Sequence, residues 1–518
     1  MNNKILIKEN IKIILLCLFP AAVIAGPLVA EIIIVIVSVL FILDIFKNKK
    51  FKLIDNKIFY YLIIFYLYLV FLSFFSEIPE KILVKTLFYF RFIIFAFAIF
   101  EIIKSNKNSL KYIYLSLSLT IFIVVADGYF QLFFDQNLLG VKKYRVDRIS
   151  GFFFEDLILG SFLSKIFLIH LALVFYFKNN LKKIFLPNII LFLLTYLLIF
   201  LSGERAAFAI SSMMILIIFI MIDYSFKIKA IVAVSISIFL SLSLINNPTM
   251  NDRYFSQLNS HLFGFDNDSK EKEFELLPNY MPMFKTALNM FKSKPIIGYG
   301  PKSYRQYCDK EEFVSFYSKI SYTNNFKIYL PNLGKKYSDL IIEKFLVTEE
   351  DILSKGQDIL IGRDIDNNLR TIKSDKSGKI RTIYNKKRVF EYEELIYLEN
   401  PNNLPENNIQ KFNACTTHPH NIYIQLLAET GIIGFLFPFI IFLILSFILI
   451  KNLFFVFLDD SKKINNFELC IIVCIFGNLW PIITSGNFFN NWINFLYYYP
   501  LGFYLLNLHL KKKNEIKS

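Results

Sequence analysis

The chain has 518 residues, of which 55% are hydrophobic, 17% aromatic and 19% charged, and its formal net charge is +15. A soluble domain contains about 25% charged and about 45–50% apolar residues, so this composition excludes an ordinary soluble globular protein. The basic residues form no compact domain and cluster in short segments between apolar blocks. That distribution argues against nucleic-acid binding and is typical of the cytoplasmic loops of a membrane protein.

Apolar blocks of about twenty residues, the length that crosses a bilayer core as a helix, recur along the chain. They predict an all-α polytopic membrane protein with about twelve transmembrane helices. The N-terminus resembles a signal peptide, but a second apolar run follows almost at once, so we expect a retained hairpin. The expected spans are 12–27, 29–46, 57–75, 82–103, 111–134, 157–177, 184–201, 206–222, 229–246, 432–456, 467–485 and 489–509.

The charges of the connecting segments predict one orientation, with both termini in the cytoplasm. Lysines occur at the N-terminus and in 47–57, 104–111, 178–183, 223–229, 451–466 and 511–518, which alternation places on one side. The segments 135–156, 202–205 and 247–418 then lie outside. We expect helices one to nine in residues 1–246, an external loop over 247–418, and three helices with a cytoplasmic tail in 419–518.

The long external loop is expected to contain an amphipathic helix over 279–292 and a polar insert over 309–410. Turn signals between short apolar runs predict a small α+β subdomain, with a hairpin around 368–385. Cys308 and Cys415 bracket this insert on the side expected to be oxidising. They are therefore expected to form a disulfide, and the alternative is two unrelated free thiols.

Two of the chain's five histidines, His418 and His420, lie just before a helix that enters the bilayer. Asn421, Gln425 and Glu429 follow at four-residue spacing and share one face of that helix. Polar residues at membrane depth favour a functional site, and a neutral histidine accepts a proton from a hydroxyl near physiological pH. The alternative is that His420 only caps or anchors the helix.

Two external segments carry cations suited to an anionic ligand. Arg205 ends the turn Ser202–Arg205, where a guanidinium can bind a phosphate through two hydrogen bonds. Its alternative role is pairing with Glu204 or with lipid headgroups. The loop 135–156 contains four cations, which are Lys142, Lys143, Arg145 and Arg148. Cations at this position can bind a lipid pyrophosphate or, alternatively, anionic lipid headgroups.

Four short motifs, in this order and all on the external side, make the chain resemble the O-antigen ligase and polymerase superfamily. They are Arg148–Gly151, Ser202–Arg205, Pro295–Pro301, and His420-Asn421 followed by Gly431 and Gly434. The insert lies outside this resemblance. Many family members carry an arginine at the start of the amphipathic loop helix, where this chain reads Asn279 to Lys285. Either Lys285 or Arg305 replaces that cation, or the role is absent.

The resemblance implies a GT-C-like, inverting glycosyltransferase that needs no metal or other cofactor. Its donor would be a glycan on undecaprenyl pyrophosphate at the periplasmic face of the bacterial inner membrane. The acceptor would be a hydroxyl, with lipid A core oligosaccharide favoured. His420 would activate that hydroxyl, and Arg205 would stabilise the departing pyrophosphate. The expected substrate-binding residues are Arg145, Arg148, Lys285, Lys302, Arg305, His418 and Asn421.

Three other activities remain open at this point. A repeat-unit polymerase and a protein O-oligosaccharyltransferase would share the same chemistry with another acceptor. A transporter for lipid-linked glycans would also have about twelve spans. The charged residues expected inside the spans are Lys85, Arg91, Asp127 and Lys165. Because they are few and scattered along the chain, they disfavour a transport path. The oligomeric state is not predicted.

Overall fold

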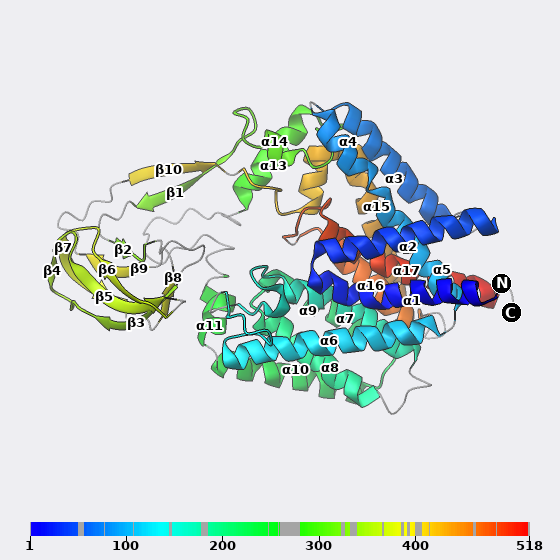
Figure 1. Ribbon diagram of the computed structural model, residues 1–518, viewed down its shortest axis with the longest axis horizontal. Coiled ribbons are helices and arrows are strands. Elements are labelled where there is room, and N and C mark those ends of the chain that lie inside the picture. Colours follow the sequence, from blue (N-terminus) through cyan, green and yellow to red (C-terminus); the bar gives the residue numbers. More distant parts are fainter. Residues whose placement is uncertain are drawn as a thin grey trace. The chain divides into compact units, whose positions relative to one another are not determined.

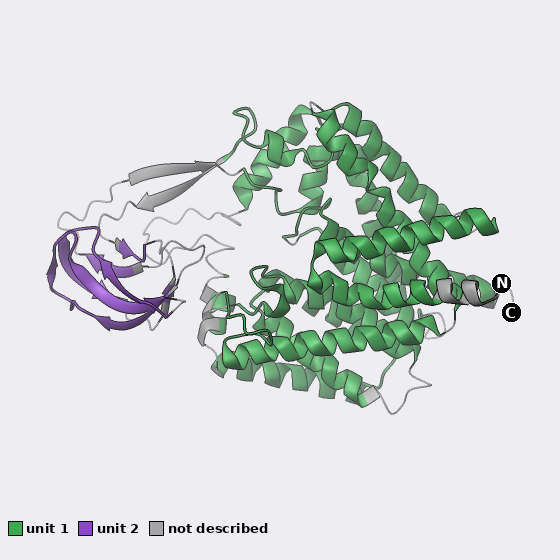
Figure 2. Cartoon of the chain, viewed as in Figure 1, with its two compact units in different colours: residues 1–315, 414–518 green, residues 316–413 purple. Residues whose placement is uncertain are grey.

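The protein folds into two compact units in a computed structural model, one of residues 1–315 with 414–518 and one of residues 316–413 (Figure 2). The structure describes residues 2–515 except 50–55, 77, 107, 145–147, 178–184, 247, 257, 259–279, 323–326, 332–338, 365–366, 385–387, 391–393, 399–406, 414, 459–462 and 483.

The larger unit is helical, and helices lie on every segment expected to span the membrane (Figure 1). These helices are α1 (Asn2–Ala25), α2 (Pro27–Asn48), α3 (Lys57–Phe74), α4 (Pro79–Leu87), α5 (Phe90–Ser105), α6 (Ser109–Phe134), α7 (Leu159–Tyr176), α8 (Phe185–Leu201), α9 (Arg205–Met221), α10 (Phe226–Asn246), α15 (Ile422–Leu458), α16 (Asn466–Asn478) and α17 (Asn491–Glu515). Shorter elements are η2 (Gly151–Phe153), α11 (Pro248–Asn251), η4 (Asp252–Ser256), α13 (Met281–Ser293) and α14 (Tyr304–Tyr307).

Seven helical segments in the described part of the chain are long and apolar enough to cross a membrane. They are Pro27–Asn48, Lys57–Phe74, Pro79–Ser105, Ser109–Phe134, Leu159–Tyr176, Phe226–Ile245 and Ile422–Leu458. Shorter apolar helices lie at Asn10–Ala25, Leu186–Leu201, Arg205–Met221 and Asn466–Asn478. The chain is therefore a largely helical, polytopic membrane protein.

The first two helices are joined by a tight turn at Gly26. Its φ of 126° is a conformation that glycine adopts without a steric penalty. Pro27 follows at the first position of α2, where its missing N–H costs no helical hydrogen bond. An ion pair between Lys12 and Asp44 joins the apolar helices. The expected hairpin of two consecutive apolar helices is present.

The smaller unit consists of strands. They are β1 (Phe316–Tyr322), β2 (Lys327–Tyr329), β3 (Asp339–Phe345), β4 (Ile352–Leu353), β5 (Asp358–Asp364), β6 (Leu369–Lys373), β7 (Gly378–Ile383), β8 (Arg388–Phe390), β9 (Glu394–Leu398) and β10 (Asn407–Asn413). One sheet has the order β2-β9-β7-β4 and another has β6-β5-β3-β8. Strands β1 and β10 pair antiparallel at the base, with Phe316 opposite Asn413.

The described residues of the insert differ from two expectations. They form strands and contain no helix, where an α+β mixture was expected. The hairpin around 368–385 is also absent, because β6 pairs with β5 whereas β7 pairs with β9 and β4. Ile372 and Ile380 both enter one apolar core shared by the two four-stranded sheets. The turn between these strands therefore crosses from one sheet to the other.

Candidate functional site

The segment Pro295–Pro301 lies against α15 at a break in that helix. Gly431 has φ 63° and ψ −171°, which are not helical values. The Gly300 N–H donates to the Glu429 carbonyl at 2.7 Å, and the Ile432 N–H donates to the Pro295 carbonyl at 2.9 Å. The backbone groups exposed by the break are thus paired with the loop and not left unsatisfied in an apolar region.

Two glycines make this close contact sterically feasible. A Cβ atom added at Gly431 would lie 2.2 Å from the Ile296 carbonyl oxygen, and one added at Gly298 would lie 2.5 Å from the Glu429 carbonyl carbon. Both positions also have positive φ values, 63° and 66° respectively. Two motifs that are about 130 residues apart in the sequence are therefore the two sides of one backbone contact.

The Glu429 side chain fixes the end of the same loop. It is fully buried, and its carboxylate accepts the Lys302 N–H at 3.0 Å and the Tyr304 N–H at 2.9 Å. It also accepts a hydrogen bond from the Gln425 side-chain Nε2 at 3.0 Å, while the Gln425 side-chain Oε1 accepts the Phe488 N–H at 2.9 Å. The polar face of α15 thus connects the loop around Lys302 to the segment that precedes α17.

His420 stands at the start of α15 with a positive φ of 54°. Its carbonyl accepts the Ser485 N–H at 2.8 Å, and the Ser485 hydroxyl accepts the Ile422 N–H at 3.0 Å. The next residue, Asn421, caps the helix by accepting the Tyr423 N–H at 3.0 Å. These bonds hold the backbone of His420 on both sides.

The histidine side chains meet one another and an aromatic ring. The ring centroids of His418 and His420 are 4.3 Å apart, and Tyr280 lies 5.6 Å from His420 in an edge-on arrangement. The His418 Nδ1 is 2.9 Å from the Thr417 hydroxyl. Both imidazoles therefore lie in a partly buried, mixed polar and aromatic environment.

These histidines line a cavity of about 910 Å³ inside the helical unit. Four cations share the lining, and they are Lys85, Lys165, Lys302 and Arg305. Asp156 is the one carboxylate in the lining among the described residues. In the same part of the chain, no group of three His, Cys, Asp or Glu side chains is arranged to hold a metal ion. An anionic ligand fits this excess of positive charge.

Burial sets the protonation of the histidines and of Lys302. Burial, reinforced by the neighbouring His420, lowers the pKa of His418 to about 4, and burial lowers the pKa of His420 as well. Burial and the nearby Lys85 lower the pKa of Lys302 to about 8. At neutral pH both imidazoles are therefore neutral proton acceptors, and Lys302 keeps most of its charge.

The turn Ser202–Arg205 is held by charged groups. Glu204 is buried and accepts the Gly160 N–H at 2.6 Å and the Ser161 hydroxyl at 2.6 Å. The turn thereby binds the first turn of α7. Burial raises the pKa of this carboxyl, and the charge of Arg148 opposes that shift. Arg205 begins α9, where the next two residues, Ala206 and Ala207, line the cavity.

Arg148 bonds to the backbone around this turn. Its guanidinium donates to the Ser202 carbonyl at 3.1 Å and to the Leu157 carbonyl at 2.9 Å. Arg253, which is buried, donates to the Gly203 carbonyl at 2.6 Å, and Arg205 donates to the Arg253 carbonyl at 3.4 Å. Arginines thus position the backbone from which Arg205 projects.

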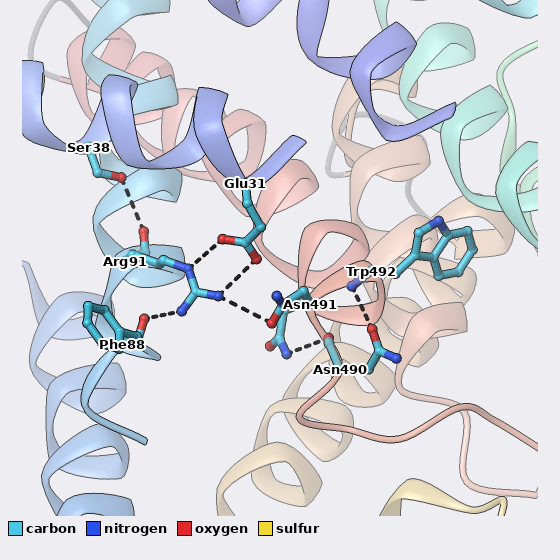
Figure 3. A network of polar contacts seen from close by, with 8 residues as sticks. Glu31, Ser38, Phe88, Arg91, Asn490, Asn491 and Trp492 are labelled. Atoms are coloured by element: carbon cyan, nitrogen blue, oxygen red, sulfur yellow. Dashed lines mark hydrogen bonds and ion pairs between the residues drawn. The ribbon is translucent and has the colours of Figure 1, made fainter. Parts of the chain in front are cut away.

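A separate ion pair fixes the start of α17 (Figure 3). The Arg91 guanidinium donates two hydrogen bonds to Glu31, at 2.7 and 2.9 Å, and one to the Asn491 side-chain oxygen Oδ1 at 3.2 Å. The Trp492 N–H donates to the Asn490 side chain at 2.9 Å. Because Asn490, Asn491 and Trp492 all line the cavity, this network orients one of its walls.

Residues 189–330 match the sequence family described as O-antigen ligase. The match contains the turn Ser202–Arg205 and the docked segment Pro295–Pro301, and it ends before His420. The resemblance to the O-antigen ligase superfamily is therefore confirmed, and it supports a glycosyltransferase of the ligase or polymerase type. No curated protein matches the chain.

The structure separates the expected site residues into two groups. His418, His420, Lys302 and Arg305 come together at the cavity. The other expected residues do not line the cavity. Asn421 and Arg148 form hydrogen bonds with backbone groups, and Lys285 is exposed on α13. Arg205 is the first residue of α9, and Arg145 lies outside the described residues.

Sequence reasoning missed two cations that line the cavity. Lys85 and Lys165 looked like scattered intramembrane charges, although they line the same space. The other two charges of that set differ, because Arg91 pairs with Glu31, and Asp127 accepts the Leu138 N–H at 2.7 Å in the loop 135–156. The sequence feature that could have identified Lys85 and Lys165 is a lysine within an apolar run. Such a lysine usually either pairs with an anionic group or has a function.

A disulfide joins Cys308 and Cys415, with the Cα atoms 5.1 Å apart. The sequence separation is 107 residues and includes the whole insert. The bridge ties the end of α14 to the strand-free segment that leads to His418. The three remaining cysteines, Cys17, Cys470 and Cys474, are free thiols within apolar helices.

Proposed function

We propose that the chain is a membrane glycosyltransferase that moves a glycan from undecaprenyl pyrophosphate to a hydroxyl acceptor. Lipid A core oligosaccharide is the favoured acceptor. The observation that carries this proposal is the cavity of the helical unit, where two neutral histidines face the same space as four cations. A proton acceptor beside an anion-binding surface is what transfer from a sugar diphosphate requires.

The proposed reaction is a single displacement with inversion at the anomeric carbon. The acceptor hydroxyl oxygen attacks C1 of the first donor sugar while its proton passes to the neutral imidazole of His420. The bond between C1 and the pyrophosphate oxygen breaks on the opposite face of the ring. Undecaprenyl pyrophosphate leaves with the electron pair, so a glycosidic bond replaces the phosphoester bond and no cofactor is consumed.

Cations of the chain take the charge that develops on the leaving group. Arg205 is proposed to contact the pyrophosphate, because it lies beside two residues of the cavity wall. Lys302, Arg305 and the newly recognised Lys85 are proposed to bind the donor phosphates before transfer. Fixed positive groups in a site of low dielectric stabilise such charge far better than water-exposed ones. The proposal therefore needs no metal ion.

The orientation proposed for the membrane follows from the loops. Lysine-rich connections support cytoplasmic termini. With about twelve spans in a GT-C-like arrangement, the proposed position of the cavity is the periplasmic face of a bacterial inner membrane. The disulfide between Cys308 and Cys415 supports an oxidising environment for that face. A lipid-linked donor would then reach the cavity from the outer leaflet.

An in vitro transfer reaction tests the function. The purified chain in nanodiscs is mixed with undecaprenyl-pyrophosphate glycan and lipid A core, in chelator and without nucleotide sugar. A glycosylated lipid A core product supports the ligase proposal. Extension of the donor glycan alone would make the chain a polymerase. Transfer to no acceptor, together with movement of the donor across proteoliposomes, would favour a transporter.

A further inference from the structure

Helices α7, α16 and α17 contribute a second group of side chains to the cavity. Lys165 on α7 lies with its ammonium 5.8 Å from the ring centroid of Trp492, at the start of α17. Asn478, the last residue of α16, lines the same cavity. Ser161 and Ser164 also line it and share the α7 face of Lys165. The proposed transfer step uses none of these side chains.

Two polar atoms of this cluster lack a hydrogen-bond partner, and its lysine has no carboxylate in direct contact. Asn478 is 8% exposed, and its amide donates to the Leu496 carbonyl at 2.8 Å, but its Oδ1 accepts no hydrogen bond. The Trp492 Nε1 is buried without an acceptor. Lys165 forms no direct ion pair with a carboxylate in the described part of the chain, because Glu204, whose charge acts on it, is hydrogen-bonded to Gly160 and Ser161. Its distance from Trp492 is near the roughly 6 Å limit of a cation–π contact.

The surrounding network holds this cluster in place. The Trp492 N–H is bonded to Asn490, and the neighbouring Asn491 is bonded to Arg91. Figure 3 shows the Trp492 indole on the other side of these asparagines from Arg91. Buried polar groups without partners cost stability, roughly 1–3 kcal/mol each, so a rigid cluster of them indicates a ligand that completes the bonds.

We propose that Lys165, Asn478 and Trp492 form a subsite for a sugar ring that carries a carboxylate, within the donor glycan. This inference rests on the proposed glycan transfer and adds the substrate class. The apolar C–H face of a pyranose can lie on the indole ring, whose face is electron-rich. A ring hydroxyl can donate to the Asn478 Oδ1 and another can accept from the Trp492 Nε1.

The carboxylate follows from the charge of Lys165. A lysine in a membrane helix seldom remains without a counter-ion. A neutral sugar would satisfy the amide and the indole but not the ammonium. A uronate supplies a negative charge on the same ring and makes a charge-assisted hydrogen bond. The subsite would therefore select acidic over neutral sugars.

Tryptophan fluorescence measures this selection directly. The chain has two tryptophans, so Trp480→Phe leaves Trp492 as the single reporter. The full-length variant in nanodiscs is titrated with a glucuronate-containing disaccharide and with its glucose counterpart. We expect saturable quenching by both, with the acidic sugar bound about tenfold more tightly, which corresponds to roughly 1.4 kcal/mol. Lys165→Gln should remove that preference.

A matched control is Lys451→Gln, since Lys451 lies 5.6 Å over the ring of Phe455 and does not line the cavity. This variant should keep the preference. Equal affinity for both sugars, or the absence of quenching, would overturn the subsite. Competitive displacement of the acidic sugar by inorganic pyrophosphate would also overturn it, because Lys165 would then serve the diphosphate. None of these results alters transfer measured with the donor, so the two proposals fail separately.

Discussion

The substitution Glu429→Gln should loosen the segment Pro295–Arg305 from α15. In the native protein the two carboxylate oxygens accept three N–H groups, from Lys302, Tyr304 and Gln425. Glutamine has nearly the same shape but presents one oxygen and one NH₂ group. At least one of the three donors must then face another donor inside a fully buried site.

The magnitude follows from these bonds. One buried N–H left without an acceptor costs about 1–3 kcal/mol, and hydrogen bonds to a neutral group are about 1 kcal/mol weaker than those to a charged one. The lower desolvation cost of the neutral amide offsets part of the loss. We therefore expect Glu429→Gln to lower the free energy of unfolding by roughly 3 kcal/mol, or about 6 °C in melting temperature.

Thermal unfolding in detergent measures the global effect, and limited trypsin digestion reports on the loop, because Lys302 and Arg305 are cleavage sites within it. Ser446→Ala on the same helix is the control, since it removes only a bond to the Phe442 carbonyl inside α15. A melting temperature and cleavage rate equal to those of the wild type would refute the role assigned to Glu429.

Three further predictions concern other parts of the chain. Burial lowers the pKa of His420, so kcat/KM should fall as pH decreases, with a midpoint below the ordinary histidine value of about 6.5; a midpoint above that value would contradict the buried neutral base. Cys308 and Cys415 should react with maleimide only after reduction, and opening this 107-residue loop should cost roughly 4–5 kcal/mol of stability by chain entropy; labelling without reductant would exclude the bridge. Replacing residues 316–413 by a short glycine-serine linker should leave the helical unit folded, because Phe316 pairs directly with Asn413; aggregation on size-exclusion chromatography would show that the units depend on each other.

The apolar periodicity of the sequence predicts the helices well, because a membrane helix must bury a long apolar run and pair its backbone internally. It predicts the β insert poorly. A polar turn such as Asp375–Gly378 shows that the chain reverses, but not which strands then pair. Here Ile372 and Ile380 enter a common core from different sheets, which requires packing information that is absent from local sequence.

The candidate site was predictable only where motif and position coincide. The loop that leads to Lys302 lies against α15, the helix that His420 precedes, because Gly298 and Gly431 let the two backbones touch. The roles of Arg148 and Asn421 were not predictable, because a polar side chain near a helix end suits either a ligand or a backbone carbonyl. Lys85 and Lys165 are 80 residues apart in sequence, and only the fold shows that they share a cavity.

The most direct test of the cavity as the transfer site is the single-turnover transfer rate of His420→Ala and Arg205→Ala, measured with saturating donor. The control is His509→Ala, a histidine near the end of α17 that packs on Phe100 and does not line the cavity. We predict that both site variants lose at least about 100-fold in rate while remaining folded, as expected for the loss of a general base or of a charge-stabilising group. Rates within a few-fold of the His509→Ala control would contradict the account.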